Sequence, residues 1–332
     1  MKPYISSNTL NNFFFYDDTH PREDDRLEII RSLTSHPKFV SPKYFYDETG
    51  SQLFDQVCDL PEYYPTRTEL ALLDQFTDEI YECVGADTYL FEMGSGSSIK
   101  IRMLLDTLQP QTYLPIDISK EHLINAASNI AELYSWLTVK AICLDYSRPW
   151  NIPKDILQAS RRNSGKNVVF FPGSSIGNFE PQHALHILKE IAKLIGHGGG
   201  LLIGVDVKKS TSILEAAYND SQGITAQFNL NMLSHLNRLF DATFDTAAFE
   251  HRAFFNDEKS RIEMHLEAQQ AMTVNLSRHN VHFKKGETIH TENSYKYSKE
   301  AFSKLCLQAG LALKKTWTDD KQLFNLYYFE KE

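Results

Sequence analysis

Cysteine is scarce in this sequence, and its spacing fits neither a metal-binding nor a disulfide framework. No two of the four cysteines form a CxxC pair, which argues against a zinc site and against a disulfide-stapled fold. The cysteines are Cys58, Cys83, Cys143 and Cys306. His183 and His186 occur on a predicted helix with no cysteine nearby, which favours solvated or core histidines. We therefore expect reduced thiols, a cytoplasmic protein and no bound metal.

Long apolar runs and an excess of basic residues are also missing. No apolar run could span a bilayer, and the segment MKPYISSNTLNNFFFYDD has no apolar core of signal-peptide length. Lys and Arg total 34 against 43 Asp and Glu, a net charge of −9, and no long basic run occurs. The sequence therefore predicts neither a membrane nor a nucleic acid as a partner, and we expect a monomer.

Strand-like and helical segments alternate from about residue 68 onward. Five strand-like segments end in glycine or acidic residues, and helical segments lie between them. They are residues 88–97, 112–119, 137–147, 167–179 and 201–207. Near-continuous apolar strands that alternate with helices predict an α/β fold, a parallel sheet with helices on both faces.

The pattern changes after Val207. Residues 211–240 favour helices, and residues 262–274 and 281–298 alternate as antiparallel strands do. A helix and closing strands follow to the end of the sequence. We therefore predict a sheet domain of residues 69–208 and 298–332, and a second, α+β lobe of residues 1–68 and 209–297.

The glycine loop FEMGSGSSIK follows the first of these strands and precedes a helix. A dinucleotide fingerprint needs a third glycine, but position 99 is Ile, so NAD is disfavoured although an oxidoreductase remains an alternative. S-adenosylmethionine fits better, because its sulfonium prefers an acidic strand end such as Glu92 to a phosphate cradle. Asp117 could accept both ribose hydroxyls, although it and Glu92 could instead be helix caps. The predicted cofactor residues are Glu92, Gly94, Ser95, Gly96, Lys100, Asp117, Asp145 and Tyr146, with the last two at the adenine.

Several long blocks of the sequence resemble one enzyme family. They are FYDETGSQLFDQVCDLPEYYPTRTE, EMGSGSSIKIRMLLD, FFPGSSIGNF, AYNDSQGITAQFN and IEMHL followed by GETIHTENSYKY. In this order they closely resemble the histidine-specific Nα-methyltransferases that form hercynine, the trimethylated histidine precursor of ergothioneine. The resemblance begins near residue 36. It implies a class I, Rossmann-like methyltransferase fold with a substrate lobe, and S-adenosylmethionine as the cofactor, released as S-adenosylhomocysteine.

The same resemblance implies roles for residues of the substrate site. Tyr46 is expected near the reacting amine, and Asn178 in the turn with Gly173 is expected to hold the amine and carboxylate of the amino acid. We take Tyr46 and Asn178 as the candidate catalytic residues. The remaining candidates are Tyr63 in the pocket, Tyr218 at the carboxylate, and Met264, Glu292 and Ser294 around the imidazole.

The stretch LPEYYPTRTE carries two tyrosines between two prolines. Each proline restricts the backbone, so the turn displays its phenols rigidly. We expect Tyr63 to face the ligand and Tyr64 to pack. Thr66 with Glu69 three residues later has the pattern of a capping box at the next helix.

Methyl transfer from a sulfonium needs a neutral amine in line with the bond that breaks, and no covalent nucleophile or metal. Asn178 can orient the amine but cannot deprotonate it. Tyr46 is a weak base because an unperturbed phenol has a pKa of about 10, so the base is left unassigned. The resemblance implies Nα-trimethylation of L-histidine. Its alternatives are methylation of another aromatic amino acid such as tryptophan, and a non-catalytic sensor of the same ligands.

Overall fold

The protein is described by a computed structural model that covers residues 10–18, 23–150, 152, 156, 165–277 and 279–332. The chain divides into two compact units, each formed from separate stretches of sequence. Unit 1 comprises the described residues of 1–19, 65–208 and 296–332, and unit 2 those of 20–64 and 209–295.

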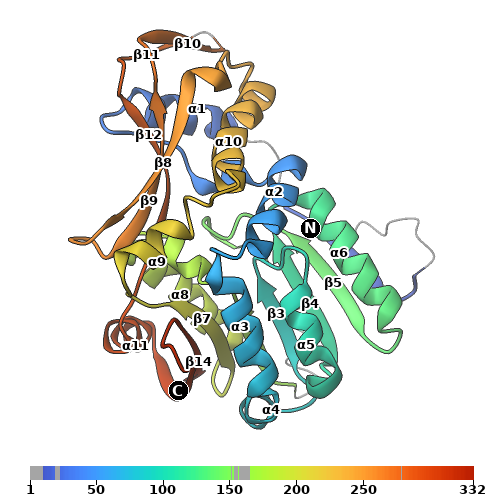
Figure 1. Cartoon of the computed structure of the whole chain (residues 1–332). Coiled ribbons are helices and arrows are strands. Elements are labelled where there is room, and N and C mark those ends of the chain that lie inside the picture. The colour runs from blue at the N-terminus through green and yellow to red at the C-terminus, as the bar shows by residue number, and fades with distance from the viewer. Residues whose placement is uncertain (1–9, 19–22, 151, 153–155, 157–164, 278) are drawn as a thin grey trace. The chain divides into compact units, whose positions relative to one another are not determined.

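Unit 1 is built on an eight-stranded sheet with the order β1-β5-β4-β3-β6-β7-β14-β13 (Figure 1). The strands from β1 to β7 in this order run parallel, and β14 is antiparallel to both β7 and β13. Their bounds are β1 Phe13–Asp17, β3 Tyr89–Met93, β4 Thr112–Asp117, β5 Thr138–Cys143, β6 Asn167–Phe171, β7 Gly200–Asp206, β13 Leu311–Thr318 and β14 Phe324–Lys331.

Helices cover both faces of this sheet. Every residue of β3, β4 and β7 is buried, as expected of parallel strands that are covered on both sides. The predicted α/β class, with a parallel sheet covered by helices on both faces, is therefore confirmed. The helices are α3 Tyr64–Gln75, α4 Thr77–Val84, α5 Ile99–Leu108, α6 Lys120–Leu133, α8 Pro181–Ile195 and α11 Lys299–Gln308, with the short helix η2 at Ser175–Asn178.

The N-terminal strand departs from the predicted domain division. We assigned residues 1–68 to the second lobe, but β1 pairs with β5 in the sheet of unit 1, from Phe13 opposite Val139 to Asp17 opposite Cys143. Its sequence, FFFYD, has strong β propensity, and pairing satisfies the open edge of β5 while it buries Phe13 and Phe15. Residues 1–9 and 19–22 of that predicted lobe lie outside the described part of the chain.

Unit 2 contains a four-stranded sheet with the order β2-β12-β9-β8, and a separate hairpin of β10 and β11. Strands β8, β9 and β12 are antiparallel neighbours. None of the described helices of either unit is both long enough and apolar enough to cross a bilayer. The elements of unit 2 are α1 Glu23–Thr34, β2 Lys38–Phe39, η1 Pro42–Phe45, α2 Glu48–Asp59, α9 Thr211–Ala216, α10 Ile224–Phe240, η3 Thr246–Ala248, β8 Phe249–Asn256, β9 Arg261–Ala268, β10 Met272–Leu276, β11 His279–Phe283 and β12 Thr288–Tyr295.

Candidate functional site

The glycine loop of unit 1 turns sharply after β3. Gly94 and Gly96 have φ values of 64° and 48°, in the left-handed region that favours glycine. The N–H of Gly96 donates to Asp117 Oδ2 at 3.0 Å, and the N–H of Ser119 donates to Asp117 Oδ1 at 2.9 Å. Asp117 therefore fixes the loop to the end of β4. Each of its oxygens retains a further lone pair for a ligand hydroxyl.

Two features of the loop fit a polar ligand. The Oγ of Ser95 is buried and has no hydrogen-bond partner among the described residues. A buried hydroxyl without a partner is uncommon, and a bound ligand would satisfy it. A Cβ added at Gly96 would meet no atom within 4 Å, so the space beside this glycine is open.

Glu92 is a buried carboxyl in β3, only 1% exposed. Tyr113 donates its hydroxyl to Glu92 Oε2, and the hydroxyls of Tyr113 and Ser98 lie 3.2 Å apart. Burial raises the pKa of Glu92 to about 8, even though the Tyr113 hydrogen bond favours the ionised form. A positively charged ligand nearby would shift this carboxyl toward its ionised form.

Tyr146 lies beside the glycine loop. A Cβ added at Gly94 would stand 3.4 Å from the Tyr146 hydroxyl. The ring packs edge-on against Phe171 and Phe179, with centroids 5.9 and 6.1 Å away. The structure thus brings together the loop after β3 and the first residues after β5, as expected for carboxyl ends of parallel strands.

Asp145 makes contacts typical of a turn cap. Its Oδ1 accepts from the N–H of Ser147 at 3.0 Å, and its Oδ2 lies 3.4 Å from Arg148 Nε. These contacts are local, so they do not themselves indicate an adenine contact.

The capping box predicted for Thr66 and Glu69 is wrong. Helix α3 begins at Tyr64, so Thr66 lies inside it, and Glu69 is completely buried. Glu69 accepts the N–H of Gly173 and pairs with Lys100 Nζ at 2.7 Å. The signal that could have revealed this was the apolar stripe Leu72, Leu73 and Phe76, which continues one turn back to Glu69.

The turn after β6 is held rigidly. Gly173 and Ser174 have φ values of 76° and 58°, and η2 follows directly. The Oγ of Ser174 accepts the N–H of Asp206 at 2.9 Å. Asn178, half-buried, ends η2, so its position follows from this turn.

An aromatic cluster of Tyr46, Phe54, Tyr63, Tyr218 and Phe228 occupies unit 2. Tyr63 contacts Phe54 and Tyr218 edge-on, with centroids 6.4 and 6.1 Å away, and Tyr46 contacts Phe54 and Phe228, both at 5.9 Å. Burial raises the pKa of Tyr63 well above its usual value, so the phenol stays a donor. Phe54 and Phe228 were not among the predicted site residues, although both lie in the blocks that carry the resemblance.

Tyr64, by contrast, is a packed residue. Its ring is almost completely buried, and its hydroxyl accepts from Lys209 Nζ at 2.6 Å.

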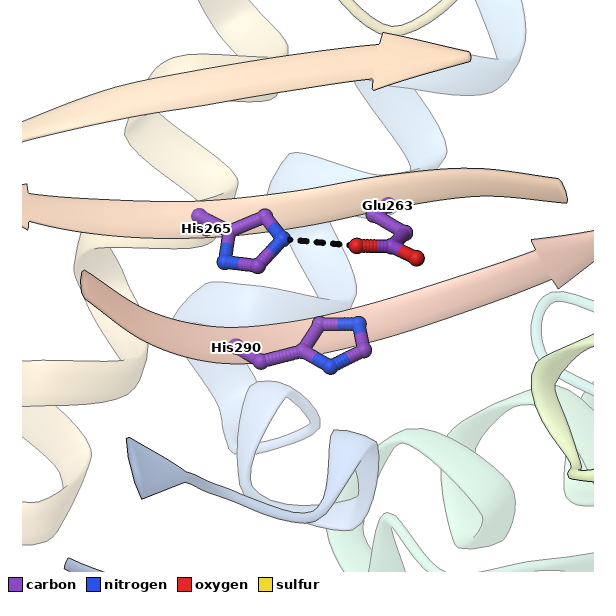
Figure 2. Close-up of side chains that lie close together, drawn as sticks. All are labelled: Glu263, His265 and His290. Atoms are coloured by element: carbon purple, nitrogen blue, oxygen red, sulfur yellow. Dashed lines mark hydrogen bonds and ion pairs between the residues drawn. The ribbon is translucent and has the colours of Figure 1, made fainter. Parts of the chain in front are cut away.

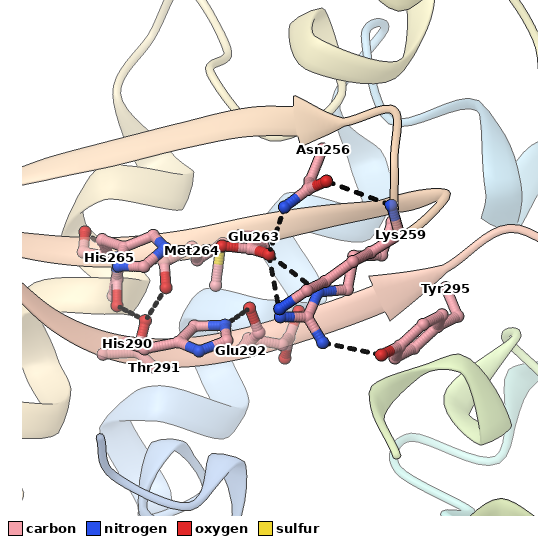
Figure 3. Close-up of polar contacts among 11 residues, drawn as sticks. Asn256, Lys259, Glu263, Met264, His265, His290, Thr291, Glu292 and Tyr295 are labelled. Carbon is pink, nitrogen blue, oxygen red and sulfur yellow. Dashed lines mark hydrogen bonds and ion pairs between the residues drawn. The ribbon is translucent and has the colours of Figure 1, made fainter. Parts of the chain in front are cut away.

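Glu292, Ser294 and Met264 lie on adjacent strands of unit 2. Glu292 pairs with Met264 across β12 and β9 (Figure 3). Ser294 pairs with Ile262 on the same two strands. All three predicted residues are buried, Glu292 to 9% exposure. Tyr218 donates its hydroxyl to Ser294 Oγ at 2.8 Å. Because Tyr218 also contacts Tyr63 edge-on, this hydrogen bond connects Ser294 on β12 to the aromatic cluster.

Comparisons with known proteins give a consistent result. The model of the family described as "Histidine-specific methyltransferase, SAM-dependent" matches residues 25–331. The histidine N-alpha-methyltransferase of Mycolicibacterium smegmatis is 39% identical, over 91% of this chain and 93% of that protein. Ergothioneine biosynthesis protein 1 of Neurospora crassa is 29% identical over 85% of this chain, which spans 32% of that longer protein. The 4-dimethylallyltryptophan N-methyltransferase of Aspergillus fumigatus is 27% identical, over 88% of this chain and 89% of that protein.

Proposed function

Because the chain belongs to the histidine-specific, S-adenosylmethionine-dependent methyltransferase family, we propose that it trimethylates the α-amine of L-histidine to form hercynine. It is an enzyme with a class I methyltransferase fold, and S-adenosylmethionine is its methyl donor. The structural observation that best supports histidine as the substrate is the buried carboxylate of Glu292 beside Met264 and Ser294.

Residues of the glycine loop and its neighbours would hold the cofactor. Asp117 would accept the ribose hydroxyls, Ser95 Oγ would gain the partner it lacks, and Glu92 would face the cationic end. The bound cofactor supplies a methyl group on a sulfonium. In each transfer an N–C bond forms from the amine lone pair, the S–C bond breaks, and the amine loses its proton beforehand.

The residues of this chain lower the barrier further by holding the amine in line with the methyl group. Correct alignment of two reacting groups can lower a barrier by up to roughly 7–11 kcal/mol. We assign this role to Asn178, through the amine and carboxylate of histidine, and to Tyr46 near the amine. The faces of the aromatic cluster can stabilise the growing ammonium cation as its N–H donors are replaced by methyl groups.

Glu292 would select the substrate by its imidazole. The ionised carboxylate accepts a ring N–H, and Ser294 can donate or accept beside it. An amino acid without this ring would leave Glu292 buried without that partner, which costs about 1–3 kcal/mol or more. The bulky indole of tryptophan fits a carboxylate at this position less well than imidazole does.

The test is a methylation panel. Purified protein, S-adenosylmethionine and each of histidine, tryptophan, tyrosine and phenylalanine are incubated separately, and products are identified by mass. We expect histidine to gain three methyl groups. Conversion of tryptophan but not histidine would support the aromatic alternative, to which the Aspergillus relative lends weight by its name. Stable binding of both ligands without any methylated product would support a sensor.

We also propose that the protein acts as a cytoplasmic monomer without a nucleic-acid or membrane partner. The net charge of −9 and the four cysteines, which form no disulfide in the described part of the chain, are consistent with this proposal. Light scattering coupled to size-exclusion chromatography tests the monomer, which a mass near twice 38.1 kDa would contradict.

A further inference from the structure

The sheet of unit 2 carries a second cluster on the face opposite to Met264 and Glu292. Glu263 and His265 on β9 and His290 on β12 each offer one ligand atom, and these atoms all lie within 4.8 Å of one another (Figure 2). The two imidazole rings are directly opposite in register and stack at 4.6 Å between centroids. Two histidines and a carboxylate form a ligand set that transition metals use.

A β-bulge separates this cluster from the substrate residues. His290 pairs with His265 and Glu292 pairs with Met264, so one extra residue, Thr291, lies between them on β12. Side chains alternate across a sheet, so without the bulge His290 and Glu292 would share a face. The bulge sends His290 to the Glu263 face and Glu292 to the Met264 face.

The three side chains are in the protonation states that bind metals. Burial lowers the pKa of His290 to about 4 and also lowers the pKa of His265, so both rings are neutral near pH 7. Burial alone would raise the pKa of Glu263, but hydrogen bonds from Arg261 and His265 outweigh it and bring the value to about 2. Neutral imidazoles and an ionised carboxylate are the forms that coordinate a metal.

Neighbouring groups orient the carboxylate. Glu263 Oε1 accepts from Asn256 Nδ2 at 2.9 Å (Figure 3) and from Arg261 Nε at 2.8 Å. Glu263 Oε2 lies 3.2 Å from His265 Nε2. Two ligands on a tetrahedral zinc ion are about 3.3 Å apart, given bonds of about 2.0–2.2 Å. This pair therefore already has the required spacing, and His290 must move closer.

The hydrogen bonding of the cluster is also incomplete. Nδ1 of His265 is buried and has no hydrogen-bond partner among the described residues. Two guanidinium groups flank the cluster, Arg261 paired with Glu263 and Arg252 paired with Glu267. Their charge opposes any dication, so only a metal that binds imidazole strongly is expected, and magnesium or calcium is not.

We propose that Glu263, His265 and His290 bind a transition-metal ion of the zinc class. His290 Nε2 donates to the backbone carbonyl of Glu292 at 3.1 Å. Coordination through this nitrogen moves its proton to Nδ1 and removes the hydrogen bond that spans the bulge. Metal binding therefore loosens Glu292 and weakens the binding of histidine. This effect on substrate binding rests on the proposed function.

Metal binding itself is tested without any measurement of activity. Untagged protein, freed of metal with a chelator, is titrated with Co²⁺ and followed by its visible ligand-field absorption, with Zn²⁺ as the competitor. We expect one saturable site in the wild type. The double variant His265→Ala/His290→Ala should bind more than about 100-fold more weakly, and Asn256→Ala about 10-fold, because it loses only a hydrogen bond to a ligand.

The matched control is His279→Ala/His282→Ala, which removes two exposed histidines from β11 of the same unit. It should bind cobalt as the wild type does, and circular dichroism should show that all variants are folded. Equal binding by the wild type and the His265→Ala/His290→Ala variant, or no saturable binding by the wild type, would overturn the metal site.

A kinetic experiment tests the coupling separately. Added Zn²⁺ should raise the KM for histidine in the wild type and in the β11 control, and should leave His265→Ala/His290→Ala unaffected. Saturable cobalt binding with an unchanged KM would refute the coupling while the metal site stands. A failure to methylate histidine at all would refute the proposed function and would leave the cobalt titration valid.

Discussion

Both carboxylate oxygens of Glu69 accept the backbone N–H of Gly173, at 2.8 and 3.1 Å. The two residues lie 104 positions apart, on α3 and in the turn that leads to Asn178. Lys100 on α5 neutralises the same carboxylate. One buried acid thus ties together three segments around the candidate site of unit 1.

Replacement of this acid should be costly. In Glu69→Gln the negative charge opposite Lys100 is lost, and in either orientation of the amide its NH2 group faces the Gly173 N–H, so two donors oppose each other inside the protein. We expect a loss of about 1–3 kcal/mol in the free energy of unfolding, measured with urea. Turnover should also fall because the turn that carries Asn178 is loosened.

Glu190→Gln serves as the control for this variant. Glu190 pairs with exposed Lys193 on the same helix, and such surface pairs contribute little. Equal stability of Glu69→Gln and Glu190→Gln would contradict the role given to Glu69.

Glu92 should make stability depend on pH. Its pKa is raised from about 4.5 to about 8 by burial, so the folded protein keeps a proton that the unfolded chain releases between these values. Stability contributed by the protonated carboxyl is therefore fully present below pH 4.5 and is lost as pH rises toward 8. The variant Glu92→Gln lacks this proton, so its stability relative to the wild type should increase over the same range. Urea unfolding at intervals from pH 5 to 9 measures it, and a constant difference would refute the shifted carboxyl.

Glu292→Gln should weaken the recognition of histidine. The amide keeps the shape but loses the charge, and hydrogen bonds to charged groups contribute about 1.5–3 kcal/mol. We expect kcat/KM for histidine to fall roughly 10- to 100-fold, mainly through KM, with unchanged affinity for S-adenosylhomocysteine. Glu267→Gln on strand β9, an acid paired with Arg252, is the control. A KM for histidine that is unchanged in Glu292→Gln would remove this residue from the specificity site.

Asn178→Asp should impair turnover and spare the cofactor. A carboxylate in place of the amide repels the substrate carboxylate and cannot donate to it, so we expect kcat/KM to drop about 100-fold or more. Calorimetry with S-adenosylhomocysteine should give wild-type affinity. Asn280→Asp makes the same change at an exposed position of β11 and should leave turnover and cofactor affinity unchanged. Equal loss of cofactor binding in Asn178→Asp would mean that the residue has been misassigned.

The sheet of unit 1 was predictable because its strands are local signals. Buried apolar runs such as 89–93 and 200–206 stand out between helical segments, and their order follows from repeated strand–helix connections. The position of β1 in this sheet could not be predicted, because its partner β5 is more than a hundred residues away in sequence. No local sequence signal marks a strand that pairs at a sheet edge. For Glu69 a local capping pattern competed with a buried contact to Gly173, and the buried contact prevailed.

The substrate-site residues were predicted from the family resemblance, whereas the cofactor residues were predicted from the chemistry of the strand ends. Sequence alternation cannot reveal the bulge at Thr291, because register is a property of two strands. For the same reason His290 could not be associated with His265, which lies on the neighbouring strand. The absence of a metal site was predicted from the spacing of cysteines and histidines along the sequence alone, and this spacing does not show which residues are neighbours across a sheet.

Strand β14 covers the outer edge of β7, a strand buried at every position. During synthesis that edge stays open until the whole of unit 2 and α11 have been made, since β14 follows them in sequence. An uncovered apolar strand is a template for pairing with other molecules. The nascent chain must therefore be shielded from aggregation over this interval, and loss of residues 324–331 would make the exposure permanent.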